Sequence, residues 1–153
     1  RGLPLMPRTK PPAAALLASP DDVEAQFYEA LQQADVDKLM AVWADDDEIV
    51  CVHPGGPRVS GHAAIRDSFA AIFDNGAVPL QPQRVRRLHT LGCAVHHVVE
   101  QVQLGDAQGG RSAWVLATNV YVKTTLGWRM VAHHASPGSE PDEPAPEAPS
   151  TLH

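Results

Sequence analysis

Hydrophobic residues recur at helical spacing in three segments of the first half of the chain. The first segment follows Ser19, which can cap a helix, and Pro20, which suits a first helical turn. The second follows Asp35, and the third spans residues 62–74 and ends near Gly76. The apolar positions are Val23, Phe27, Ala30, Leu31 and Ala34, then Val36, Leu39, Met40 and Trp43, then Ile65, Phe69, Ile72 and Phe73. Residues spaced three or four apart share one helix face, so the pattern predicts three amphipathic helices.

The rest of the chain is rich in β-branched residues and predicts strands. A short one covers residues 48–53 and stops at Pro54-Gly55-Gly56, and longer ones cover 83–90, 94–104, 112–124 and 128–135. Short glycine-containing turns separate the late strands, which favours an antiparallel meander. Helices come first, then one strand, a helix and a run of strands. This order predicts an α+β fold in which a curved antiparallel sheet wraps around three helices and leaves an internal pocket.

Proline and aromatic residues mark the limits of the packed domain. Of the 14 prolines, ten lie near the two ends of the chain, whereas all eight aromatic residues lie between Phe27 and Trp128. We therefore expect a domain over residues 19–137, a flexible Pro-rich extension over 1–18 and a flexible, acidic Pro-rich tail over 138–153.

Charge and cysteine usage narrow the class of protein. The formal net charge is −6, which disfavours nucleic acid as a partner, and no apolar run is long enough to cross a membrane. Cys51 and Cys93 form no CxxC motif, so neither a disulfide framework nor a zinc knuckle is expected. These features predict a cytoplasmic protein.

Three polar residues in strands are candidates for chemistry. His53 ends the first strand next to Pro54, where an imidazole can act as an acid or base near neutral pH. Glu100 interrupts a valine-rich strand, and it faces either solvent or a polar pocket. Asn119 is a poor strand former, which leaves two readings: its amide ties down the backbone or contacts a ligand.

Paired histidines add one candidate. If Trp128, Met130 and Ala132 face the pocket, strand alternation places His134 there as well and turns His133 outward. His96 and His97 form a similar opposed pair. Because adjacent strand histidines point to opposite faces, they do not readily bind one ion together, so no metal and no cofactor are expected.

Several separated motifs resemble the SnoaL-like and ketosteroid-isomerase-like branch of the nuclear transport factor 2-like superfamily. They are Ala34-Asp35-Val36-Asp37, Ala44-Asp45-Asp46-Asp47, His53-Pro54, Ser60-Gly61-His62-Ala63-Ala64-Ile65-Arg66, Ala117-Thr118-Asn119-Val120 and Trp128-Arg129-Met130-Val131. The resemblance implies a cystatin-like cone with an internal pocket, and a homodimer formed through the outer face of the sheet.

The resemblance also implies where the chemistry lies, and this chain departs from it there. The isomerases have an aspartate base where His53 stands, a tyrosine at Phe27, with Tyr28 beside it, and a protonated aspartate at Asn119. Steroid isomerisation is therefore not expected, because phenylalanine cannot donate a hydrogen bond.

Two hypotheses remain. One is an isomerase- or lyase-like enzyme without cofactor, in which His53 is the base, Asn119 donates a hydrogen bond and His134 assists on a small apolar carbonyl compound. The other is a non-catalytic ligand-binding or dimeric assembly module. The expected pocket walls are Phe27, Trp43, Phe69, Glu100, Trp114, Trp128 and Met130.

Overall fold

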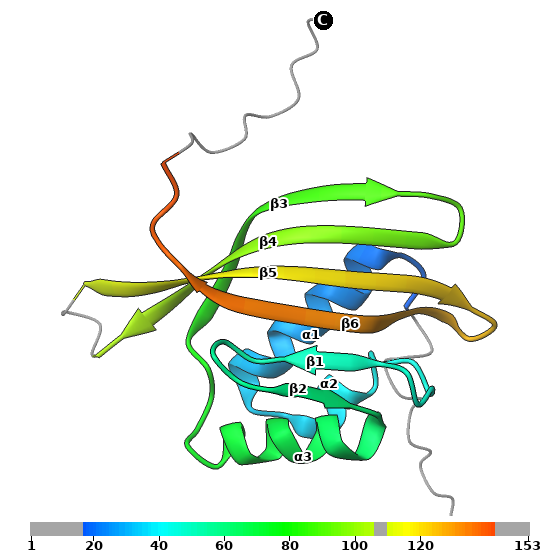
Figure 1. Cartoon of the computed structure of the whole chain (residues 1–153), viewed down its shortest axis with the longest axis horizontal. Helices are drawn as coiled ribbons and strands as arrows, with labels where there is room; N and C mark the ends of the chain where they lie inside the picture. Colours follow the sequence, from blue (N-terminus) through cyan, green and yellow to red (C-terminus); the bar gives the residue numbers. More distant parts are fainter. Residues whose placement is uncertain (1–16, 106–109, 143–153) are drawn as a thin grey trace, which may run out of the picture.

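The computed structural model describes residues 17–105 and 110–142. Three helices, α1 (Pro20–Gln33), α2 (Val36–Met40) and α3 (His62–Phe73), lie beside one six-stranded sheet (Figure 1). The strands are β1 (Val50–Val52), β2 (Arg58–Ser60), β3 (Leu80–His89), β4 (Cys93–Leu104), β5 (Arg111–Thr124) and β6 (Gly127–Gly138). Their order across the sheet is β2-β1-β6-β5-β4-β3. The predicted α+β architecture is confirmed.

The sheet is antiparallel except at one junction. β3, β4, β5 and β6 form the expected meander, and β1 pairs with β6 in parallel. This parallel pairing sets Cys51 opposite His133, so the end of β1 lies next to the middle of β6. The sheet curves over α1 (Figure 1). β2 was missed in the sequence because three residues are too few to show strand alternation.

The helices begin where the sequence predicts. The Ser19 side chain accepts a hydrogen bond from the Asp22 backbone N–H, and Asp35 does the same for Lys38 at the start of α2. Val23, Phe27 and Leu31 on α1 are buried in the core between helices and sheet.

A β-bulge in β6 reverses the predicted alternation of its side chains. Val120 pairs with Ala132 and Tyr121 pairs with Met130, so Val131 has no residue opposite it. After this extra residue His133 is buried and His134 is exposed. The inward orientation predicted for His134 is therefore wrong.

Leu17 belongs to the packed core, although we assigned it to the N-terminal extension. It is 4% exposed, and its carbonyl accepts a hydrogen bond from the Trp128 backbone N–H. The parts of the two predicted extensions at residues 1–16 and 143–153 lie outside the described residues. Within the described part of the chain, no helix combines the length and apolar character needed to cross a membrane.

Gly127 allows Leu17 to pack closely against the start of β6. Its φ is +112°, and a Cβ added there would lie 2.6 Å from the Leu17 carbonyl oxygen.

We expect Gly127→Ala to lower the free energy of unfolding by about 1–3 kcal/mol, measured by chemical denaturation. Gly92→Ala is the matched control, because a Cβ there meets nothing within 4 Å. Equal stability of the two variants would contradict this packing.

Candidate functional site

A small cavity lies between the helices and the inner face of the sheet, near the end of β1. Its volume is about 130 Å³. Apolar side chains form most of its wall, together with the three titratable residues His53, Glu100 and His133. The lining residues are Leu31, His53, Pro54, Phe69, Ile72, Val78, Leu80, Glu100, Val102, Val115 and His133. The cavity therefore brings acid–base groups from β4, from β6 and from the residue that follows β1 into one apolar space.

The protonation of His53 follows from its neighbours. Ser68 donates its hydroxyl hydrogen to the Ile65 carbonyl at 2.7 Å, so Ser68 Oγ can only accept from His53 Nε2, 2.9 Å away. The Nε2 nitrogen carries the proton, and Nδ1 keeps the lone pair. Burial lowers the pKa of His53, and the Phe69 ring packs edge-on against the imidazole. His53 is therefore a neutral group with a basic Nδ1 at pH 7.

Glu100 is a buried carboxyl that titrates near neutrality. Burial raises its pKa from 4.5 to about 7, and the nearby Glu24 carboxylate adds to this rise. Tyr28 opposes the rise by donating its hydroxyl hydrogen to Glu100 Oε2 at 2.7 Å. The second oxygen, Oε1, has no hydrogen bond within the described part of the chain.

Asn119 is fully buried and uses both ends of its amide. Its Nδ2 donates to the Tyr28 hydroxyl at 3.0 Å and to Glu24 Oε2 at 3.5 Å. Its Oδ1 accepts from His133 Nδ1 at 2.6 Å. The sequence left open whether the amide ties down the backbone or contacts a ligand; in the structure it holds three other side chains in place instead of the backbone.

His133 takes the inward position that we assigned to His134. Because its Nδ1 donates to Asn119, its Nε2 carries the lone pair. Burial lowers its pKa to about 3, with further contributions from His53 and His134. The imidazole is therefore neutral at pH 7. Its ring packs against Phe27 at a centroid distance of 4.9 Å.

Glu100 Oε1 and His133 Nε2 are not completely enclosed by other protein atoms. Over residues 17–105 and 110–142, the one fully enclosed side-chain nitrogen or oxygen without a hydrogen bond is Trp43 Nε1. Glu100 Oε1 and His133 Nε2, which have no protein partner either, are thus not sealed off. A ligand in the cavity could use both atoms.

Few of the predicted wall residues line this cavity. Phe69 and Glu100 do, and Phe27 packs directly behind Phe69 and His133. Met130 and Trp128 are buried elsewhere in the core, and Trp128 lies at the start of β6 beside Leu17. The other two tryptophans, Trp43 and Trp114, do not line this cavity either.

Trp114 and Trp43 were both predicted in the pocket, and neither is there. Trp114 alternates with the buried residues Val115 and Ala117, so its side chain lies on the outer face of β5. Trp43 lies after α2 and lines a different hollow.

Sequence reasoning missed Tyr28 and Glu24 as partners of the site. They are four residues apart on α1 and therefore share one face of the helix, the spacing that could have identified them. Their partners, Glu100, Asn119 and Tyr121, lie 72 to 97 residues away in sequence. Only the folded chain shows that these side chains meet.

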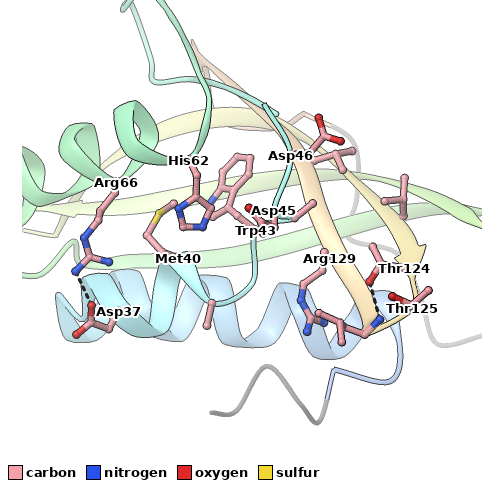
Figure 2. Close-up of a pocket in the computed structure, with 15 residues that line it drawn as sticks. Asp37, Met40, Trp43, Asp45, Asp46, His62, Arg66, Thr124, Thr125 and Arg129 are labelled. Carbon is pink, nitrogen blue, oxygen red and sulfur yellow. Dashed lines mark hydrogen bonds and ion pairs between the residues drawn. The ribbon is translucent and has the colours of Figure 1, made fainter. Parts of the chain in front are cut away.

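A larger hollow of about 650 Å³ lies between α2 and the turn that joins β5 to β6 (Figure 2). Its wall carries charges of both signs, including an ion pair between Asp37 and Arg66. Trp43 and Met40 are among its lining residues (Figure 2). It lacks the close set of neutral acid–base groups that distinguishes the smaller cavity, which we therefore take as the candidate site.

Comparison with known proteins shows the family to which this chain belongs. The model of the SnoaL-like domain matches residues 21–140. A proposed calcium/calmodulin-dependent protein kinase type II association domain from Thiobacillus denitrificans is 35% identical, with a TM-score of 0.74 over 80% of this chain and 98% of that one. A proposed dehydratase of the NTF2-like family from Streptomyces avermitilis is 32% identical, with a TM-score of 0.67 over 77% and 92%.

A third structure confirms the expected cone. A protein with a cystatin-like fold from Caulobacter vibrioides has a TM-score of 0.67 over 78% of this chain and 87% of that one, at 14% identity. At this level of identity the likeness concerns the fold alone. No curated protein matches the chain.

The raised pKa of Glu100 predicts a pH-dependent stability. The folded state favours the protonated carboxyl, so its contribution to stability is full below pH 4.5 and is lost as pH rises through about 7. Over this window wild type should lose about 3 kcal/mol relative to Glu100→Gln. Chemical denaturation between pH 4 and 8 measures the free energy of unfolding of both proteins. The contributions of the two buried histidines, His96 and His133, cancel in the difference because both proteins contain them.

The matched control is Glu140→Gln, since Glu140 is exposed. It should follow the wild-type profile throughout. Parallel profiles of wild type and Glu100→Gln would show that Glu100 is not held in its protonated form.

Proposed function

Because this chain belongs to the SnoaL-like domain family of the nuclear transport factor 2-like superfamily, we propose that its cavity is an acid–base site for a small carbonyl compound. His53 is the base that removes a proton from a carbon next to the carbonyl. Glu100, protonated, donates a hydrogen bond to the developing oxyanion. The reaction class is isomerisation or elimination by proton transfer, which needs no cofactor.

The proposal rests on one observation: a neutral base and a carboxyl with a pKa of about 7 line the same apolar cavity. A general acid or base works best when its pKa lies near the working pH. A carboxyl kept neutral by burial can donate a hydrogen bond that a carboxylate cannot. Glu100 takes the donor role that the sequence had suggested for Asn119, because the Asn119 amide is already fully used.

The size and lining of the cavity limit the substrate. At about 130 Å³ it is smaller than the roughly 300–1,000 Å³ that drug-sized ligands fill. A compound of a few carbon atoms fits such a space, whereas a steroid does not. Leu31, Ile72 and Val115 favour an apolar body next to the carbonyl group.

Substitution of His53 tests the proposed base. A panel of small ketones and enones is first screened for compounds that raise the melting temperature of the full chain. For a compound that binds, NMR in deuterated water follows exchange of the protons next to its carbonyl. We expect His53→Ala to slow the exchange by about 100-fold or more.

His134→Ala is the control, because this exposed side chain lies on the other face of β6. It should exchange the protons at the wild-type rate. A His53→Ala protein that binds the same compound and exchanges its protons at the wild-type rate would falsify the assignment.

Assembly through the outer face of the sheet is a second candidate function. α1 lies on the inner side of the sheet (Figure 1). Leu116 alternates with the buried residues Val115 and Ala117 on β5, so it lies on the outer face, where it is 46% exposed. A shallow hollow of about 320 Å³ around Leu116, Thr118 and His134 gives this face a shape that a second copy could fill. The relative from Thiobacillus denitrificans is described as an association domain. These features support a homodimer.

Leu116→Glu tests the dimer. A charge that becomes buried in the centre of an interface costs several kcal/mol, so the variant should be monomeric where wild type is dimeric. Light scattering coupled to size-exclusion chromatography gives the mass of each. Leu91→Glu is the control, because Leu91 is 96% exposed in the turn between β3 and β4. A monomeric wild type would refute the dimer.

A further inference from the structure

A second group of polar side chains lies where α1 begins beside the β3–β4 hairpin. Asp21 and Glu24 come from the first turns of α1, and His96 comes from β4. One ligand atom from each lies within 4.8 Å of the others. The proton transfer proposed above uses none of these three residues.

His89 on β3 completes the group. In the hairpin Arg87 lies opposite His96, and His89 is two residues further along β3 on the same face. The two Nε2 atoms are 2.9 Å apart, the ring centroids are 5.1 Å apart and the ring planes differ by 16°. The rings therefore meet end to end, with each Nε2 directed at the other. From the sequence we compared only the adjacent histidines, which point to opposite faces of a strand, and therefore missed the pairing of His96 with His89.

Glu24 fixes the protonation of His96. Its Oε2 lies 2.9 Å from His96 Nδ1, so this nitrogen carries the proton and Nε2 keeps the lone pair. A carboxylate that receives the N–H of a histidine in this way is the usual outer partner of a metal-binding imidazole. His96 is completely buried, and its lone pair points toward His89 and Asp21.

Two of the distances in this group are close to those between the ligands of a small cation, and the third, between His89 and Asp21, depends on how these two exposed side chains turn. Ligands of a tetrahedral ion with bonds of roughly 2.0–2.1 Å are about 3.3 Å apart. The distance of 2.9 Å between the two Nε2 atoms and that of 4.0 Å from His96 Nε2 to Asp21 Oδ1 lie on either side of this value. His89 and Asp21 are exposed and can adjust their side chains, while His96 is held in place.

We propose that His89, His96 and Asp21 bind a divalent transition-metal ion of the Zn²⁺ class, with Glu24 as the residue that positions His96. Two imidazoles and one carboxylate are ligands that Zn²⁺ accepts, and water fills the remaining position. To bind through Nε2, His89 moves its single proton to Nδ1 by exchange with solvent. The ion would join the start of α1 to β3 and β4, and so stabilise the folded state.

Arg87 opposes the ion in the metal-free state. Its Nε donates to Asp21 Oδ1 at 2.8 Å, so a guanidinium holds the oxygen that the metal needs. Removing this positive charge should strengthen metal binding. Such a gain would not follow if the contacts of Asp21 were only structural.

The test is titration of the full chain with Zn²⁺ by calorimetry, with Co²⁺ absorption as a report of ligand geometry. Wild type should bind one ion. His89→Ala should weaken binding about tenfold or more, and Arg87→Gln should strengthen it. His97→Ala is the control, because His97 lies next to His96 but is exposed and contacts Thr118 across the strands.

Because His89 is exposed, its alanine variant should fold, which circular dichroism checks. Asp21→Asn provides a second variant and should also weaken binding. The proposal is overturned if wild type binds no Zn²⁺, or if His89→Ala and Asp21→Asn bind it as tightly as wild type. Failure of this test would not affect the acid–base function proposed for the cavity, because the two proposals use different residues.

Discussion

The arrangement of helix and sheet depends on how the buried carboxylate of Glu24 is satisfied. A buried charge costs several kcal/mol unless hydrogen bonds replace its water. Glu24 Oε2 accepts from Tyr121 at 2.8 Å, from His96 at 2.9 Å and from Asn119 at 3.5 Å, and the side chain is nearly inaccessible to solvent. These donors stand on β4 and β5, so α1 can lie on the sheet in only one register. Apolar packing alone would allow the helix to slide.

That register determines the chemistry one turn further along α1. Tyr28 reaches both Glu100 and Asn119, and Asn119 in turn orients the His133 imidazole, which burial keeps neutral. The parallel pairing of β1 with β6 sets Cys51 opposite His133, and His53, two residues further on, lines the same cavity as His133. The cavity thus gathers two neutral imidazoles and a carboxyl that titrates near neutrality, inside a wall of apolar side chains. A fold of this kind supports many activities, because such local contacts, rather than the sheet itself, set the protonation of each group.

One cluster of hydrogen-bonded side chains therefore connects two separate sites in the molecule. At one end, Glu100 and His133 face the cavity; at the other, His96 meets His89 at the edge of the hairpin. Glu24 and Asn119 lie between them and make most of the shared hydrogen bonds. Since Glu24 and Asn119 are buried and hydrogen-bonded to several side chains, each end keeps its geometry with little dependence on exposed loops.

The sequence by itself determined the helices, the long strands and the order that makes an α+β cone, because hydrophobic periodicity is a local property of the chain. It also singled out His53, Glu100 and Phe69, which line the small cavity. A polar residue in an apolar strand, or an aromatic residue on a helix face, can be recognised from the local sequence alone. The sequence could not determine that a bulge at Val131 turns His133 inward in place of His134. Nor could it reveal Tyr28 with Glu100, or His89 with His96. Those contacts depend on strand register and on one helix orientation, which only the packing of the whole tertiary structure decides.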